Sequence, residues 1–263
     1  MSTTDRATAG QAFLGLLQRD TWNTLRHDLP GFLAQALLQP LAFLFVFGRV
    51  LPEIGAAGPD YGSQLLPGII ALTLVLTALQ NVALPLVIEF SFTKEIEDRL
   101  LAPLSPWAVA IEKMIFATGR AIVAAALILP LGALVLPGGL EVQGAHWELF
   151  VVLLLVGGFA GSAIGLVLGT LVPPNQINVV FAVALTPLIF TGATFYPWQG
   201  LSSLRWFQVI TLANPLTYVS EGMRGSLTSA PHLSAGWIVL GVVVSTAGFL
   251  TLGLRGFLHR AVD

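Results

Sequence analysis

The densest group of charged residues, which are those best suited to chemistry, lies in one segment. Residues 92–115 read FTKEIEDRLLAPLSPWAVAIEKMI. Within them lie Lys94, Glu95, Glu97, Asp98, Arg99, Glu112 and Lys113. Only 10 % of the whole chain is charged, so this local density stands out. Charge of both signs on a short stretch suits binding to a soluble partner. The alternative is a solvated loop whose charges only fix the topology.

The same segment predicts a short helix followed by the start of a longer one. Acidic side chains precede Leu100 and Leu101, where the positive N-terminal end of a helix stabilises them. Pro103 then stops that helix. Ser105 and Pro106 suit the N-cap and the first position of the next helix. We therefore expect a helix with one charged and one apolar side, lying across one face of a membrane.

The signatures of common enzymes are missing from the sequence. It contains no G-x-x-x-x-G-K-[ST] phosphate loop, no H-E-x-x-H zinc pair and no G-x-S-x-G nucleophile elbow. It has no cysteine, and its four histidines are far apart. We therefore predict a chain that is not itself an enzyme and binds no metal or cofactor of its own. A membrane enzyme is a weaker alternative.

The composition is that of a membrane protein. A soluble domain carries about 25 % charged residues, whereas this chain has 10 %, with 55 % hydrophobic residues. The apolar residues form long blocks, each near the ~20 residues that a helix needs to cross a bilayer. We place six spans at about 31–51, 65–89, 111–136, 147–172, 176–195 and 235–256. The net charge of −2 gives no reason to expect nucleic acid as a partner.

These segments predict an all-α polytopic membrane protein with two parts. Residues 1–30 form a cytoplasmic N-terminus with an amphipathic helix in the membrane interface, ended by Pro30 and Gly31. Residues 31–263 form one transmembrane domain, with a cytoplasmic loop at about 90–110. Prolines interrupt residues 196–231, which we interpret as two short re-entrant helices between spans five and six. Most Lys and Arg residues then lie on the inner side, so both termini are predicted to be cytoplasmic in the cell membrane.

Polar residues within the spans are candidates for lining a path. Uncharged polar side chains are costly in lipid and should face other helices or a cavity. In the first span, Gln35 and Gln39 share a face. The alternative role is hydrogen bonding between helices, worth ~0.6 kcal/mol on average. The candidates from the second and fifth spans are Thr73, Thr77, Gln80, Asn81, Asn178, Thr186, Phe190 and Thr194.

Other residues in or near the spans suggest packing. Glycines recur every four residues in the fourth span, which allows close approach of another helix within or between subunits. They are Gly157, Gly161, Gly165 and Gly169. Glu221 and Arg224 are one helical turn apart and predict a local ion pair. Glu89, Glu112 and Arg120 lie near the inner span ends, where they can snorkel or pair with each other.

Three motifs resemble those of type-2 ABC exporter permeases. Residues 95–105 (EIEDRLLAPLS) are similar to the family's loop between spans two and three, although Pro106 and Trp107 stand where a basic residue is common. Residues 192–201 (GATFYPWQGL) resemble the turn after span five. Residues 214–225 (NPLTYVSEGMRG) resemble the outer segment, with Asn214, Pro215, Tyr218, Glu221 and Arg224 at matching positions. Together with the six spans, the resemblance covers nearly the whole chain. The short outer loops and modest length resemble the drug-resistance branch of the family.

This resemblance implies a division of labour between subunits. Two copies of a separate ATP-binding cassette ATPase would hold ATP and Mg, and a second permease copy or a paralogue would complete the path. The loop residues implied to couple ATPase motion to the spans are Glu95, Glu97, Asp98, Arg99, Leu100, Leu101 and Pro103. The second and fifth spans would line the path, and the transporter would work by alternating access.

The cargo is expected to be amphipathic or lipid-like, such as a drug, an antibiotic or a lipid-linked molecule. The path candidates are amides, hydroxyls and apolar groups without a fixed charge at depth. Export of a polysaccharide or glycolipid by the same kind of permease is the first alternative. An ion-coupled secondary transporter is a weaker one, because the chain lacks broken half-spans at corresponding positions of two halves.

Overall fold

A computed structural model describes residues 9–58, 60–93, 96, 104–136 and 145–262, which form helices and no strands. The predicted coupling residues lie outside these ranges. The α-helices are α1 (Ala9–Asn23), α2 (Leu29–Phe45), α3 (Leu51–Glu53), α4 (Tyr61–Ile88), α6 (Pro106–Val135), α7 (Trp147–Leu171), α8 (Ile177–Thr191), α9 (Arg205–Thr211), α10 (Pro215–Leu227) and α11 (Ala235–Val262). Shorter helical segments are η1 (Thr24–Asp28), η2 (Val46–Val50), η3 (Glu89–Thr93), η4 (Pro174–Gln176) and η5 (Trp198–Ser203).

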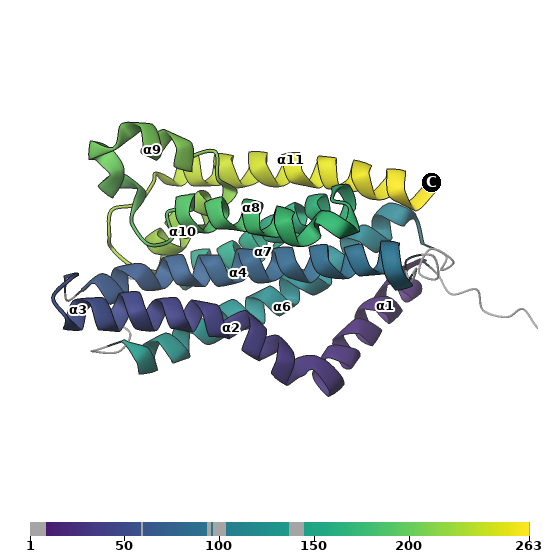
Figure 1. The fold of residues 1–263 in the computed structure, drawn as a ribbon, viewed down its shortest axis with the longest axis horizontal. Coiled ribbons are helices and arrows are strands. Elements are labelled where there is room, and N and C mark those ends of the chain that lie inside the picture. Colours follow the sequence, from purple (N-terminus) through teal and green to yellow (C-terminus); the bar gives the residue numbers. More distant parts are fainter. Residues whose placement is uncertain (1–8, 59, 94–95, 97–103, 137–144, 263) are drawn as a thin grey trace, which may run out of the picture.

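Six helical stretches in the described part of the chain are long and apolar enough to cross a membrane, as predicted. They are Gly10–Glu53, Tyr61–Thr93, Pro106–Val135, Trp147–Leu171, Pro174–Thr191 and Ala235–Ala261. In Figure 1 the start of α1 and the end of α11 lie at the same end of the molecule. The helix ends that flank the charged segment lie at that end too.

The first stretch differs from the prediction because Pro30 does not end the helix. Pro30 lies in the first turn of α2, where its missing N–H leaves no hydrogen bond unmade. The chain instead bends at the π-helical segment η1, between α1 and α2 (Figure 1). An extra residue in a helical turn is a recognised cause of such kinks.

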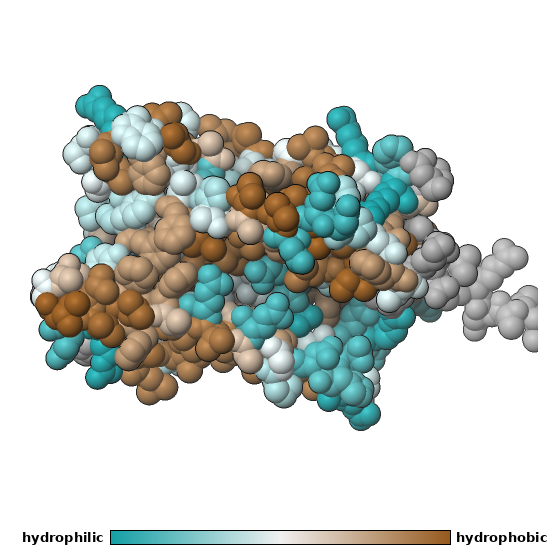
Figure 2. All heavy atoms as spheres, viewed as in Figure 1, coloured by the Kyte–Doolittle hydropathy of each residue, from teal (hydrophilic) through white to brown (hydrophobic). Residues whose placement is uncertain are grey.

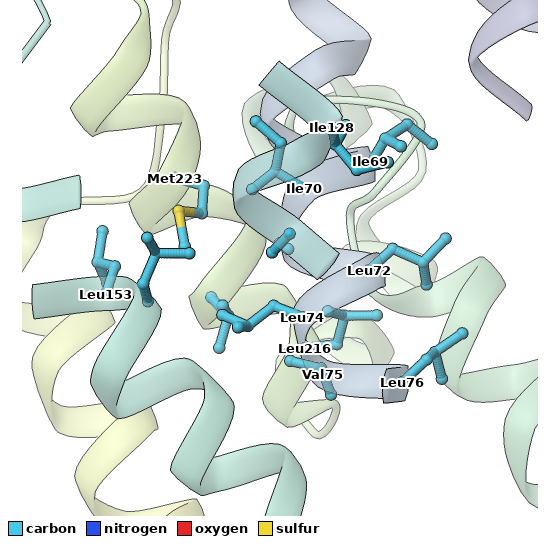
Figure 3. Packing of buried hydrophobic residues seen from close by; sticks show 14 of the residues in the cluster. Ile69, Ile70, Leu72, Leu74, Val75, Leu76, Ile128, Leu153, Leu216 and Met223 are labelled. Carbon is cyan, nitrogen blue, oxygen red and sulfur yellow. The ribbon is translucent and has the colours of Figure 1, made fainter. Parts of the chain in front are cut away.

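Helix α4 is the centre of the core. It packs on α7, α6 and α10, and most of its side chains are buried. Figure 3 shows Leu74 and its neighbours on α4 facing Leu153 of α7 and Leu216 and Met223 of α10. The helix is apolar on nearly every side, which is the pattern of a helix surrounded by others.

The glycine face of α7 makes this packing possible within one chain. A Cβ atom on Gly165 would clash with the backbone oxygen of Leu79, and one on Gly161 would lie 2.6 Å from that of Val75. Backbone therefore meets backbone along the α4–α7 contact. The other two glycines of the repeat, Gly157 and Gly169, also face α4 side chains or backbone.

Replacing Gly165 by alanine should therefore destabilise the protein by about 1–3 kcal/mol, the usual cost of overpacking. The matched control is Gly248→Ala on α11, where an added Cβ meets nothing within 4 Å. That control should be neutral or gain up to about 1 kcal/mol of helix propensity. Thermal unfolding of the purified protein in detergent measures both. Equal melting temperatures for the two variants would contradict this packing.

Two short α-helices lie between spans five and six, in the region for which the sequence predicted re-entrant helices. Helix α9 has 7 residues and α10 has 13. At ~1.5 Å per residue neither is long enough to cross ~30 Å of hydrocarbon. Helix α10 is nevertheless almost fully buried among α4, α7 and α11. It therefore holds the segment between spans five and six firmly against the spans.

Candidate functional site

Three groups of polar residues form the candidate site, and the first joins the helices that flank the charged segment. The Nζ atom of Lys113 on α6 donates to Oε1 of Glu89, at the end of α4, over 2.6 Å. Their side chains are only 7 % and 9 % exposed. Glu89 thus pairs with Lys113, not with Glu112 or Arg120, and the guanidinium of Arg120 lies 4.2 Å from the ring centre of Phe32.

The flanks of the charged segment are also well defined. Helix α6 begins at Pro106 after an extended Ser105, as predicted, although the Ser105 side chain makes no capping hydrogen bond. Ile96 is buried in an apolar cluster that includes Met114 of α6 and Leu86 of α4. Ile96 therefore shares one apolar cluster with the two helices that flank the charged segment.

The second group is the buried ion pair between Glu221 and Arg224, predicted from their spacing. The Nη1 atom of Arg224 donates to Oε1 of Glu221, and both side chains are at most 1 % exposed. Burial lowers the pKa of Arg224, and the facing carboxylate of Glu221 offsets only part of that decrease. A buried pair of this kind needs further hydrogen bonds to offset its desolvation.

Backbone groups from three other segments supply those bonds. The Glu221 carboxylate accepts from the N–H of Trp198 at 3.0 Å and from that of Leu233 at 2.8 Å. Arg224 Nη2 donates to the oxygen of Ala193 at 3.1 Å. The pair therefore ties the end of α8, the segment η5 and the start of α11 to α10.

Other residues of the 214–225 motif also serve this junction. Asn214 caps α10, with its Oδ1 accepting from Leu216 N at 2.9 Å. Its Nδ2 donates to Leu188 O at 2.9 Å, back on α8. Pro215 occupies the first turn, and the hydroxyl of Tyr218 donates to Leu212 O at 2.6 Å. Sequence reasoning missed the reciprocal side-chain bonds of Trp198 and Gln208, each donating to the other's backbone oxygen at 3.1 Å.

The third group is a polar seam between α2 and α4. Thr73, Thr77 and Gln80 of α4 line a small cavity of about 20 Å³ together with Gln35 and Gln39 of α2. This space suits about one water molecule. The structure thus brings together two sets of polar residues that the sequence indicated separately.

The other candidates for lining the path lie outside the α2–α4 seam or form hydrogen bonds within their own helix. Asn81 of α4 donates to Thr77 O at 2.7 Å, one turn back. Asn178, Thr186 and Phe190 lie on the exposed side of α8, outside the α2–α4 seam. Helix α8 ends at Thr191, so the buried Thr194 lies beyond the span in which it was predicted. In the described ranges, no three His, Asp or Glu side chains gather as metal ligands.

Comparison with known proteins gives a consistent result across the chain. A family model described as "ABC-2 type transporter" matches residues 11–228. A relative from Cyanophora paradoxa, named "Putative transport permease ycf38", is 28 % identical over 207 residues, covering 74 % of this chain and 67 % of the relative. A protein of the same name from Porphyra purpurea is 26 % identical over 237 residues, covering 84 % and 79 %. The matched range runs from α1 to the end of α10 and includes all three polar groups.

Proposed function

The chain belongs to the ABC-2 type transporter family, as the membrane component of an ABC transporter, and from this premise we propose that it is the permease of an exporter. A separate ATP-binding cassette ATPase, present in two copies, binds ATP and Mg. A second copy of this chain or a paralogue completes the translocation path. The observation that carries the proposal is the charged segment, whose two flanking helices are joined by the buried Glu89–Lys113 pair.

In this proposal the segment 94–104 receives the movement of the ATPase. The proposed contacts to the partner are Glu95, Glu97, Asp98 and Arg99, and the same coupling set includes Leu100, Leu101 and Pro103. Because Glu89 and Lys113 join α4 to α6, the two helices move together when the segment is displaced. Helix α4 packs on α7 and α10, so the movement passes to the outer segment. Alternating access then opens the path on one side at a time.

The cargo in this proposal is an amphipathic or lipid-like molecule, such as a drug, an antibiotic or a lipid-linked compound. Helix α8 supports this because it presents amide, hydroxyl and aromatic groups on an exposed face, namely Asn178, Thr186 and Phe190. None of these three groups is charged. Such a face suits a neutral or weakly polar cargo better than a small ion.

The proposed topology places the ends of the chain and residues 90–110 in the cytoplasm of a cell-membrane protein, with α9 and α10 re-entrant from outside. Because the sequence contains no cysteine, single cysteines can be labelled without background. We expect an impermeant maleimide to label Ser202→Cys in intact cells and Ser105→Cys only in inverted vesicles. Both positions are exposed. Labelling of Ser105→Cys in intact cells would overturn the proposed orientation.

The partner proposal is tested by copurification. The tagged chain should retain its ATPase through detergent extraction, and deletion of residues 94–104 should release it. The control is Ser202→Cys, an exposed position in η5, which should leave the ATPase bound. Retention of the ATPase by the deletion of 94–104 would show that this segment is not the contact.

A further inference from the structure

A mostly polar cavity and an apolar cavity adjoin each other beside α1. The first has a volume of about 580 Å³, and its lining from α1, η1, α4, η3 and α6 is mostly polar and charged, with Trp22, Pro85 and Phe116 as its apolar members. The second, of about 330 Å³, has apolar walls that include Leu25, Phe32 and Val123. Both are lined by Thr24, Phe116 and Arg120, so they adjoin one another. Figure 2 shows the hydrophilic atoms gathered over α1 and the bend into α2, next to the apolar surface of the spans.

Arg120 stands at the junction of the two cavities. Its guanidinium lies 4.2 Å from the ring centre of Phe32 and 5.7 Å from that of Phe116. Its Nε is buried without a hydrogen-bond partner, and with the described residues Arg120 forms no ion pair. A half-buried guanidinium in this state lacks the acceptors that normally offset its desolvation. Its planar set of donors suits the oxygens of a phosphate.

The charges around Arg120 define the kind of ligand. The polar cavity is lined by the basic Arg19, Lys113 and Arg120 and by the acidic Asp20, Asp28 and Glu89. Two of the basic groups have carboxylates close by, with Lys113–Glu89 at 2.6 Å and Arg19–Asp20 at 3.2 Å. Asp28 lies within electrostatic range of Arg120 but makes no ion pair with it. The lining is therefore balanced in charge. Arg120 and Asp28 remain to contact a ligand that carries both a negative and a positive group.

We propose that these cavities bind one zwitterionic phospholipid from the leaflet that contacts α1. The phosphate lies at Arg120, the headgroup ammonium faces Asp28, and one acyl chain follows the apolar groove past Phe32 and Val123. A polar cavity that opens into an apolar groove matches the two halves of a lipid, and both volumes are typical of ligand sites. The bound lipid fills the angle between α1 and α6. This proposal is independent of the cargo and of the ATPase.

Native mass spectrometry of the intact protein with defined lipids tests this site. With dioleoyl phosphatidylethanolamine, the wild-type protein should retain one lipid. Arg120→Gln should weaken that binding ten- to a hundredfold, since a hydrogen bond to a charged group is worth roughly that factor. The control is Arg255→Gln on α11, whose side chain is exposed and which should bind as the wild type does. Equal binding by Arg120→Gln would overturn the proposal.

Further measurements distinguish binding of a whole lipid from binding of its headgroup, and they control for misfolding of Arg120→Gln. Val123→Trp keeps Arg120 but fills the apolar groove, and it should also lose the lipid. Glycerophosphoethanolamine, which has no acyl chains, should bind at least tenfold more weakly, because each buried CH₂ contributes about 0.8 kcal/mol. Equal binding of this headgroup compound, or of the anionic phosphatidylglycerol, would overturn the assignment of a zwitterionic lipid.

Discussion

Replacement of Arg224 by methionine is expected to lower the unfolding free energy by about 3–5 kcal/mol, because removing one partner leaves a buried charge uncompensated. Glu221 is fully buried and has no access to water. Loss of Arg224 also removes the bond to Ala193 O, which ties α10 to the end of α8. Thermal and denaturant unfolding in detergent give the change in stability.

The control for Arg224 is the same substitution at Arg205, which is exposed at the start of α9. Arg205→Met should change the unfolding free energy by less than about 0.5 kcal/mol. The double variant Glu221→Gln/Arg224→Met should recover part of the loss, because no charge remains buried and the amide oxygen still accepts one N–H. An Arg224→Met variant as stable as Arg205→Met would show that the pair does not hold this junction.

Replacement of Lys113 by methionine is expected to have the second large effect on stability. It leaves Glu89 buried without its partner, and we expect a loss of about 3 kcal/mol in stability. It also removes the ion pair that joins the ends of α4 and α6 flanking the charged segment. The measurement is the ATP hydrolysis rate of the complete transporter in nanodiscs, together with the unfolding temperature. We expect the stimulation of hydrolysis by the permease to be lost.

The double variant Glu89→Gln/Lys113→Met separates folding from coupling. It buries no uncompensated charge, so it should regain most of the stability. If the pair is a mechanical link, the double variant folds but stimulates hydrolysis less than the wild type. Full stimulation by a stable double variant would show that the charged link is not needed for coupling.

Much of the fold could be predicted from the sequence because its signals are local. Each membrane span is a continuous apolar stretch, so length and hydropathy place it without knowledge of its neighbours. The pair Glu221–Arg224 also follows from spacing on one helix, as does the start of α6 at Pro106. The exception is Pro30, which the sequence suggested as a helix end and which the structure places inside the first turn of α2.

The features that the sequence did not predict are contacts between segments distant in the chain. Glu89 and Lys113 belong to different helices, and nothing in their spacing selects this pairing over one with Glu112 or Arg120. The seam of Gln35 and Gln39 with Thr73 likewise depends on how α2 is rotated against α4. The two cavities beside α1 are lined in part by residues of η1, where the chain bends just before the break predicted at Pro30.

The central claim is that a separate ATPase drives this permease through residues 94–104. The most direct measurement is the ATP hydrolysis rate of the ATPase alone, with the wild-type permease, and with a permease carrying Glu97→Gln and Arg99→Gln. We expect the wild-type permease to change the rate clearly and the variant to leave it close to that of the ATPase alone. A variant that changes the rate as much as the wild type would contradict the claim.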